Sequence, residues 1–126
     1  MIAVDSSSFI AFFKEDAAKD VQWISDALEN GKLVLPPPVL TEVLSNSLLP
    51  KHLVEYIEAL PLLPVFAGLW SRAGVMRSKL LAKKLKARLA DTLIAQVCID
   101  HGVPLITRDN DFRHFVTHAG LVLFEG

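Results

Sequence analysis

Short apolar runs alternate with amphipathic helical patterns along the whole of this 126-residue chain. The runs that predict strands cover residues 2–4, 33–35, 62–66, 105–107 and 121–124. The helical patterns cover approximately residues 17–28, 38–44, 51–60, 69–86, 90–98 and 111–118. Strands that alternate with helices favour a parallel sheet, because each parallel connection needs a crossover that covers one face of the sheet. We therefore predict an α/β fold: a three-layer α/β/α sandwich with a central parallel sheet of about four to five strands.

Length and composition predict one domain that spans residues 1–126. Hydrophobic residues make up 52% of the chain, which is ample for a buried core. No stretch is long and apolar enough to predict a membrane span, and the N-terminus does not resemble a signal peptide. A single cysteine, Cys98, suits a reducing compartment. We therefore expect a cytoplasmic protein with no membrane association.

Basic residues are concentrated in one segment, although the net charge is only −1. No acidic residue lies between Glu58 and Asp91, and seven of the thirteen basic residues fall in that gap. Such a segment favours local contact with an anion. Four of these residues recur at helical spacing: Arg72, Lys79, Lys83 and Lys86. They could contact an anionic ligand, and a solvated helix face explains them equally well.

Four acidic residues follow or flank the predicted strands at the end of the sheet where ligands bind in such folds. These residues are Asp5, Glu42, Asp91 and Asp109. Each taken alone is explained by turn formation, helix capping or solvent exposure. Together they would repel by roughly 4 kcal/mol for each close pair at an effective dielectric constant of about 20. An oxygen-only cluster of this kind favours a hard ion, Mg²⁺ or Mn²⁺, and hence phosphoryl or phosphodiester chemistry.

Three segments carry a resemblance to a known family. The stretch LADTLIAQVCIDHGVPLITRDNDF (89–112) resembles the signature of PIN-domain nucleases, in particular VapC-type toxins of toxin–antitoxin systems. The opening IAVDSSSFIAFF (2–13) is similar to that family's first strand with its metal-binding Asp, and PVLTEVL (38–44) to the segment that holds its Glu. The three segments occur in the expected order, so the resemblance implies a PIN-like fold over nearly the whole chain.

The resemblance also implies roles for individual residues. The catalytic and metal-binding positions correspond to Asp5, Glu42, Asp91 and Asp109, of which Glu42 would bind the ion or position the attacking water. Hydroxyl groups near the metal correspond to Ser6 or Ser7 and to Thr107. Asp111 matches the last acid of the motif, and it could instead cap the last helix. With RNA as the implied substrate, the possible RNA contacts are Arg108, beside Asp109, and the four basic residues at helical spacing, Arg72, Lys79, Lys83 and Lys86.

The function that the resemblance implies is Mg²⁺- or Mn²⁺-dependent hydrolysis of RNA phosphodiester bonds. The family's toxins imply three partners: an RNA substrate, a cognate antitoxin that covers the site, and a second copy of the chain in a homodimer. One alternative is a PIN-type RNA-processing nuclease without an antitoxin. Another is a non-catalytic PIN-fold binding module, for which loss of one or more of the acids would be the hallmark.

Overall fold

The computed structural model describes all 126 residues and contains a parallel three-stranded sheet. The strands β1 (Ile2–Val4), β2 (Leu33–Val34) and β3 (Leu105–Ile106) lie in the order β2-β1-β3. In this register Ile2 pairs with Leu33, and Ala3 with Leu105. The predicted α/β class with a central parallel sheet is confirmed, and all three strands end at the same edge.

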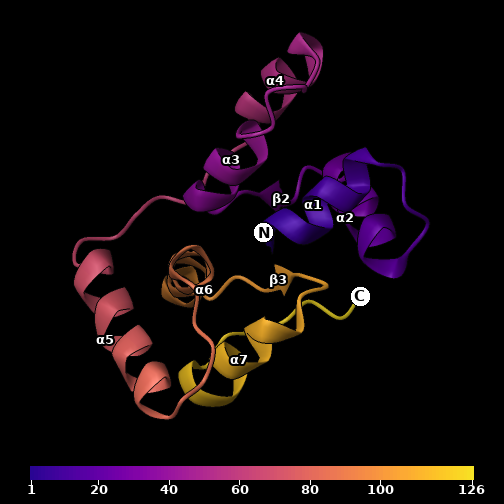
Figure 1. Cartoon of the computed structure of the whole chain (residues 1–126). Helices are drawn as coiled ribbons and strands as arrows, with labels where there is room; N and C mark the ends of the chain where they lie inside the picture. The colour runs from indigo at the N-terminus through magenta and orange to yellow at the C-terminus, as the bar shows by residue number, and fades with distance from the viewer.

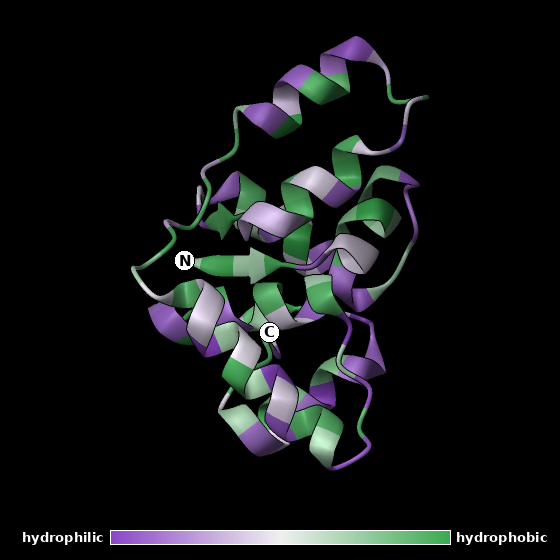
Figure 2. Cartoon of the chain, turned by 60° about the vertical axis from the view of Figure 1, so that its left-hand side comes forward, coloured by the Kyte–Doolittle hydropathy of each residue, from purple (hydrophilic) through white to green (hydrophobic).

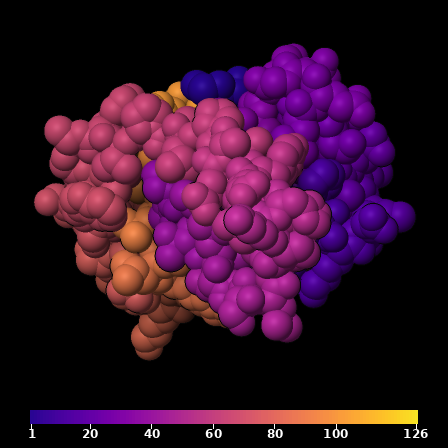
Figure 3. All heavy atoms as spheres, turned by 90° about the horizontal axis from the view of Figure 1, so that it is seen from above, coloured from indigo at the N-terminus to yellow at the C-terminus, as the bar shows by residue number.

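Helices connect the strands and cover the sheet on both sides. They are α1 (Ser6–Phe13), α2 (Lys19–Glu29), α3 (Pro37–Leu44), α4 (Lys51–Glu58), α5 (Leu69–Ala82), α6 (Leu89–His101) and α7 (Arg113–Ala119), the last preceded by the 3₁₀ turn η1 (Asn110–Phe112). Helices α1 and α2 lie on one side of the sheet, and α5 and α6 on the other, while α3 and α4 extend past its edge (Figure 1). Seen from above, the α3–α4 segment lies between α5 and the N-terminal helices (Figure 3).

The core lies between the sheet and these helices. Ala3 and Val4 of β1 are completely buried, and Ile24 of α2 and Ile94 of α6 are at most 1% exposed. The apolar sides of the helices turn inward and their polar sides outward, around an apolar central strand (Figure 2). None of the helices has both the length and the hydropathy needed to cross a membrane.

The two outer predicted strands are reduced to single parallel bridges, Leu35 with Leu62 and Leu105 with Leu123. The sheet itself has three strands, and the predicted number of about four to five is reached only when the two bridges are counted. Pro61 and Pro64 have no N–H group to donate, so pairing around Leu62 cannot continue along the chain.

The local predictions need two corrections. Residues 6–13, for which the sequence patterns predict no helix, form α1, which begins directly after β1 because the Asp5 carboxylate caps it. The helix predicted over residues 69–86 ends at Ala82 and continues without a break through Gly74. A lone glycine lowers helix stability by about 1 kcal/mol, which packing against α6 offsets.

Candidate functional site

Asp5 occupies the centre of the carboxyl edge of the sheet. Its side chain is only 3% exposed, and it accepts the Ser8 N–H at 3.0 Å as the N-cap of α1. The Thr107 hydroxyl donates to Oδ2 at 2.7 Å, and the Ser7 hydroxyl lies 2.9 Å from both carboxylate oxygens. The pKa of Asp5 is raised above its usual value, because the effect of burial outweighs that of these hydrogen bonds, which lower it. The nearby charge of Asp109 adds to the increase. Asp5 is thus a buried carboxylate with a fixed orientation.

Thr107 connects Asp5 to Asp109. Its hydroxyl donates to Asp5 and also accepts the backbone N–H of Asp109 at 3.0 Å. The Asp109 carboxylate in turn accepts the backbone N–H of Asp111 at 2.9 Å and so caps η1. The adjacent strands β1 and β3 therefore bring residues 5, 107 and 109 together.

Replacing Thr107 by valine, which has nearly the same shape, should destabilise the protein by about 1–3 kcal/mol. The reason is that Asp5 loses a donor and the Asp109 N–H loses its acceptor. Chemical denaturation of Thr107→Val measures the loss, with Thr117→Val on the exposed face of α7 as the matched control. Equal stability of the two variants would show that the Thr107 hydroxyl contributes nothing.

Glu42 reaches the same region from α3. This helix begins directly after β2, where Pro36 ends the strand and Pro37 and Pro38 form the first turn. The exposed Glu42 carboxylate accepts the hydroxyl of Ser6 at 2.7 Å. Ser6 and Ser7, which are consecutive residues of α1, therefore donate hydrogen bonds to two different carboxylates, those of Glu42 and Asp5.

Asp91, in the first turn of α6, is the least satisfied of the four acids. Its Oδ2 atom is buried without a hydrogen-bond partner. Burial, followed by the charges of Asp109 and Glu42, raises the pKa of Asp91 to about 6, although Arg88 lowers it in part. The negative charges of its neighbours therefore repel the Asp91 carboxylate, and its Oδ2 atom has no hydrogen-bond donor.

The carboxylates are neighbours but do not form a closed ligand cage, since no three acidic, histidine or cysteine side chains lie close enough together to hold one ion. Their chemistry nevertheless fits a hard divalent ion. The donors are all carboxylate oxygens, they repel one another, and one buried oxygen has no partner. Mg²⁺ retains several waters when bound and does not require a cage of protein ligands.

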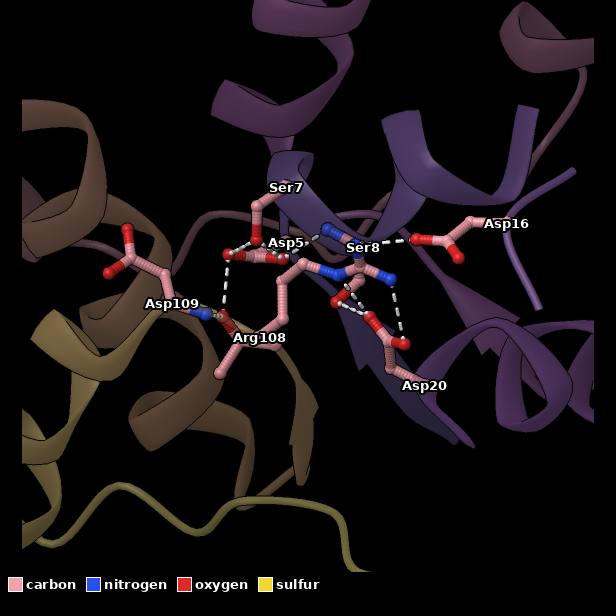
Figure 4. Close-up of polar contacts among 8 residues, drawn as sticks. Asp5, Ser7, Ser8, Asp16, Asp20, Arg108 and Asp109 are labelled. Carbon is pink, nitrogen blue, oxygen red and sulfur yellow. Dashed lines mark hydrogen bonds and ion pairs between the residues drawn. The ribbon is translucent and has the colours of Figure 1, made fainter. Parts of the chain in front are cut away.

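The predicted accessory residues have separate surroundings. Lys86 lies beyond the end of α5, not on a shared helix face, and its Nζ is 3.1 Å from Asp111 Oδ2. Arg108 points away from Asp109 toward Asp16 and Asp20 near the start of α2 (Figure 4). Sequence reasoning missed these two acids. Asp20 is visible in the sequence only as an ordinary acid in the first turn of a helix.

The other predicted basic residues line a groove of about 700 Å³ between α5, α6 and α7. Lys79 and Lys83 lie along it. Arg72 also lines the groove, but its guanidinium already donates to the Asp100 carboxylate and to the carbonyl of Ala67. A role for Arg72 in RNA contact stays a prediction.

The sequence and the fold match one protein family. The PIN domain family model matches residues 2–116, and the chain belongs to that family. It is 29% identical over 120 residues to VapC ribonuclease Mb1587 of Mycobacterium bovis and to Ribonuclease VapC11 of Mycobacterium tuberculosis, with 89% of each chain covered.

Two solved structures share the fold. One is VapBC2 from Rickettsia felis bound to a DNA fragment from their promoter, with a TM-score of 0.71, 20% identity and 98% coverage of both chains. The other is VapBC-5 from Mycobacterium tuberculosis, a member of the VapBC family of toxin-antitoxin systems. Its TM-score is 0.69 at 19% identity, over 99% of this chain and 98% of the matched one.

Proposed function

We propose that this chain is a single-domain, Mg²⁺- or Mn²⁺-dependent ribonuclease, and that Asp5, Glu42, Asp91 and Asp109 form its active site. The observation that carries the proposal is the state of Asp91, which has a buried oxygen without a partner and a raised pKa among three other acids. A cation relieves such an arrangement, because it supplies the missing partner and offsets the repulsion. The ribonuclease names of the relatives support RNA as the substrate.

The four acids would have distinct tasks. Asp5, Asp91 and Asp109 would hold the ion, directly or through water, and Glu42 would bind it or orient the attacking water. A bound divalent ion supplies charge stabilisation at a phosphoryl oxygen and lowers the pKa of a water molecule. The hydroxyls of Ser6, Ser7 and Thr107 keep the carboxylates in place through the hydrogen bonds described above. The Lys86–Asp111 pair would border the RNA path at this edge.

We further propose that the chain is the toxin of a toxin–antitoxin pair, acts in the cytoplasm, and is inhibited by a cognate antitoxin. Both structural matches are VapBC proteins, which supports this assignment. A homodimer is supported by exposed apolar side chains near the site, among them Trp70 at 66% and Leu89 at 63% exposure. An RNA-processing nuclease without an antitoxin is the alternative, and an upstream antitoxin gene would separate the two.

Removal of divalent ions is expected to abolish RNA cleavage. Purified protein incubated with total RNA in Mn²⁺ or Mg²⁺ should give discrete fragments, because a defined site cuts defined positions. EDTA should remove the activity, and added Mn²⁺ should restore it. Fragments that persist in EDTA would contradict the proposed chemistry, and Mn²⁺ binding without any cleavage of RNA would favour a non-catalytic module.

The groove lined by Lys79 and Lys83 predicts how the affinity for RNA depends on salt concentration. If Lys79 and Lys83 contact phosphates, replacing both by alanine should raise the KM for RNA. The slope of log affinity against log salt should also become shallower by about 1.4, since each phosphate contact on a single strand contributes about 0.7. Binding measured across a salt series tests this, with Lys51→Ala on the exposed start of α4 as control. An unchanged slope would show that these two lysines form only a solvated surface.

A further inference from the structure

We propose that Arg108 is a positioning residue. Its bidentate ion pair with Asp20, called the clamp below, determines how tightly the four-carboxylate site holds a divalent ion. This inference rests on the proposed function, because it assigns a role within the same site. Arg108 stands between two residues of that site, Thr107 and Asp109, although its own side chain contacts neither a carboxylate of the site nor its hydroxyls.

The clamp joins two distant parts of the chain. Arg108 donates from Nε and Nη2 to the two oxygens of Asp20, at 2.8 and 2.9 Å, and from Nη1 to Asp16 at 2.9 Å. The Arg108 and Asp109 side chains point in opposite directions from the same backbone (Figure 4). A bidentate guanidinium–carboxylate pair fixes orientation as well as distance. The backbone that carries Asp109 is therefore anchored to the start of α2.

Ser8 links the clamp to the other side of the site. This residue is completely buried, its N–H holds Asp5 Oδ1, and its hydroxyl donates to Asp20 Oδ2 at 2.8 Å. Asp20 is itself 8% exposed, so its charge depends on these partners. Asp5 and Asp109 are thus both tied to one anchor, Asp20, which lies behind the site.

The site needs such an anchor because its members repel one another. Carboxylates that lose their support can turn outward to solvent, and then fewer of them remain at the sheet edge to hold an ion with its bound waters. Asp16 and Asp20 already engage the Arg108 cation, so its role is to hold the backbone in place and not to neutralise the site. Residues behind a metal site commonly change metal affinity or activity by about 10- to 100-fold when they are removed.

The test is the affinity of the full chain for Mn²⁺, measured by titration calorimetry without RNA. Arg108→Ala should weaken Mn²⁺ binding about 10- to 100-fold. Arg108→Lys should restore part of the loss, because lysine keeps the charge but not the bidentate fork. Asp20→Asn should also weaken binding, and its combination with Arg108→Ala should be no weaker than the worse single variant, since both remove the same contact.

A matched pair elsewhere separates positioning from general stability. The Arg72–Asp100 ion pair has side-chain exposures of 42% and 9%, against 37% and 10% for Arg108–Asp20. Arg72→Ala and Arg108→Ala should both lower the Tm, but only Arg108→Ala should weaken Mn²⁺ binding. If Arg108→Ala binds Mn²⁺ as tightly as the wild type and changes only the KM for RNA, Arg108 is a substrate contact. In that case this inference is wrong, while the proposed function stands. A wild-type chain that neither binds Mn²⁺ nor cleaves RNA overturns the proposed function as well.

Discussion

Replacing Asp91 by asparagine is expected to make the protein more stable at pH 7.5 while it abolishes ion binding. The ionised Asp91 carboxylate is partly buried, repelled by Asp109 and Glu42, and has an oxygen without a partner. Asparagine removes the charge and with it the repulsion from Asp109 and Glu42. The pKa of Asp91 is raised from 3.8 to about 6. A shift of that size corresponds to about 3 kcal/mol, which partial solvent screening reduces to about 1–2 kcal/mol.

Because the pKa of Asp91 is raised in the folded chain, the stability gain of Asp91→Asn depends on pH. Between pH 4 and pH 6 the unfolded chain releases the Asp91 proton while the folded chain retains it, so the wild type loses stability over that range. The stability advantage of Asp91→Asn should therefore be absent near pH 4, appear as the pH rises, and be complete above pH 6. In terms of Tm, the gain is about 4–8 °C for a domain of this size.

Differential scanning calorimetry without divalent ions measures this gain, and Asp26→Asn on the exposed side of α2 provides the control. Mn²⁺ at 100 times its dissociation constant should stabilise the wild type by about 2.7 kcal/mol and leave Asp91→Asn unchanged. A variant that is less stable than the wild type at pH 7.5 would show that Asp91 is a structural acid and not a strained ligand.

Asp5→Asn should reduce RNA cleavage by more than 100-fold, the upper end of the range for residues that only support a metal ligand. Asp5 is the most deeply buried of the acids, and it lies between the hydroxyls of Ser7 and Thr107. Asparagine keeps the carbonyl oxygen that can cap α1 and accept the Ser8 N–H, and asparagine and aspartate cap helices about equally well. The variant should therefore remain folded.

Cleavage of total RNA in Mn²⁺ by equal amounts of wild type, Asp5→Asn and Asp26→Asn tests this prediction. Circular dichroism and a melting curve establish that Asp5→Asn is folded. Residual cleavage equal to that of the wild type would point to a contaminating nuclease and would remove Asp5 from the proposed site. Loss of cleavage in Asp26→Asn as well would show that the effect is not specific to the site.

Local sequence patterns predicted much of the fold. The alternation of apolar runs with helical patterns is sufficient for the parallel sheet, because strand and helix periods differ and each crossover covers a face. Gly102, in the left-handed conformation with φ 62°, ends α6, and glycine just after the last helical residue is a common helix stop signal. The same patterns missed α1, although Asp5 followed by Phe9, Phe12 and Phe13 carries a capping residue and helical spacing.

The sequence by itself determined which residues we propose to carry the chemistry, since the acids and their order are visible in three short segments. Only the tertiary structure decided how they are held. Hydrogen bonds between Ser6 and Glu42, Thr107 and Asp5, and Arg108 and Asp20 join residues 36, 102 and 88 positions apart. No local pattern encodes such pairs, because they arise only when the sheet places the ends of separate strands at one edge. The unpartnered oxygen of Asp91 is likewise a product of burial, which depends on everything packed around it.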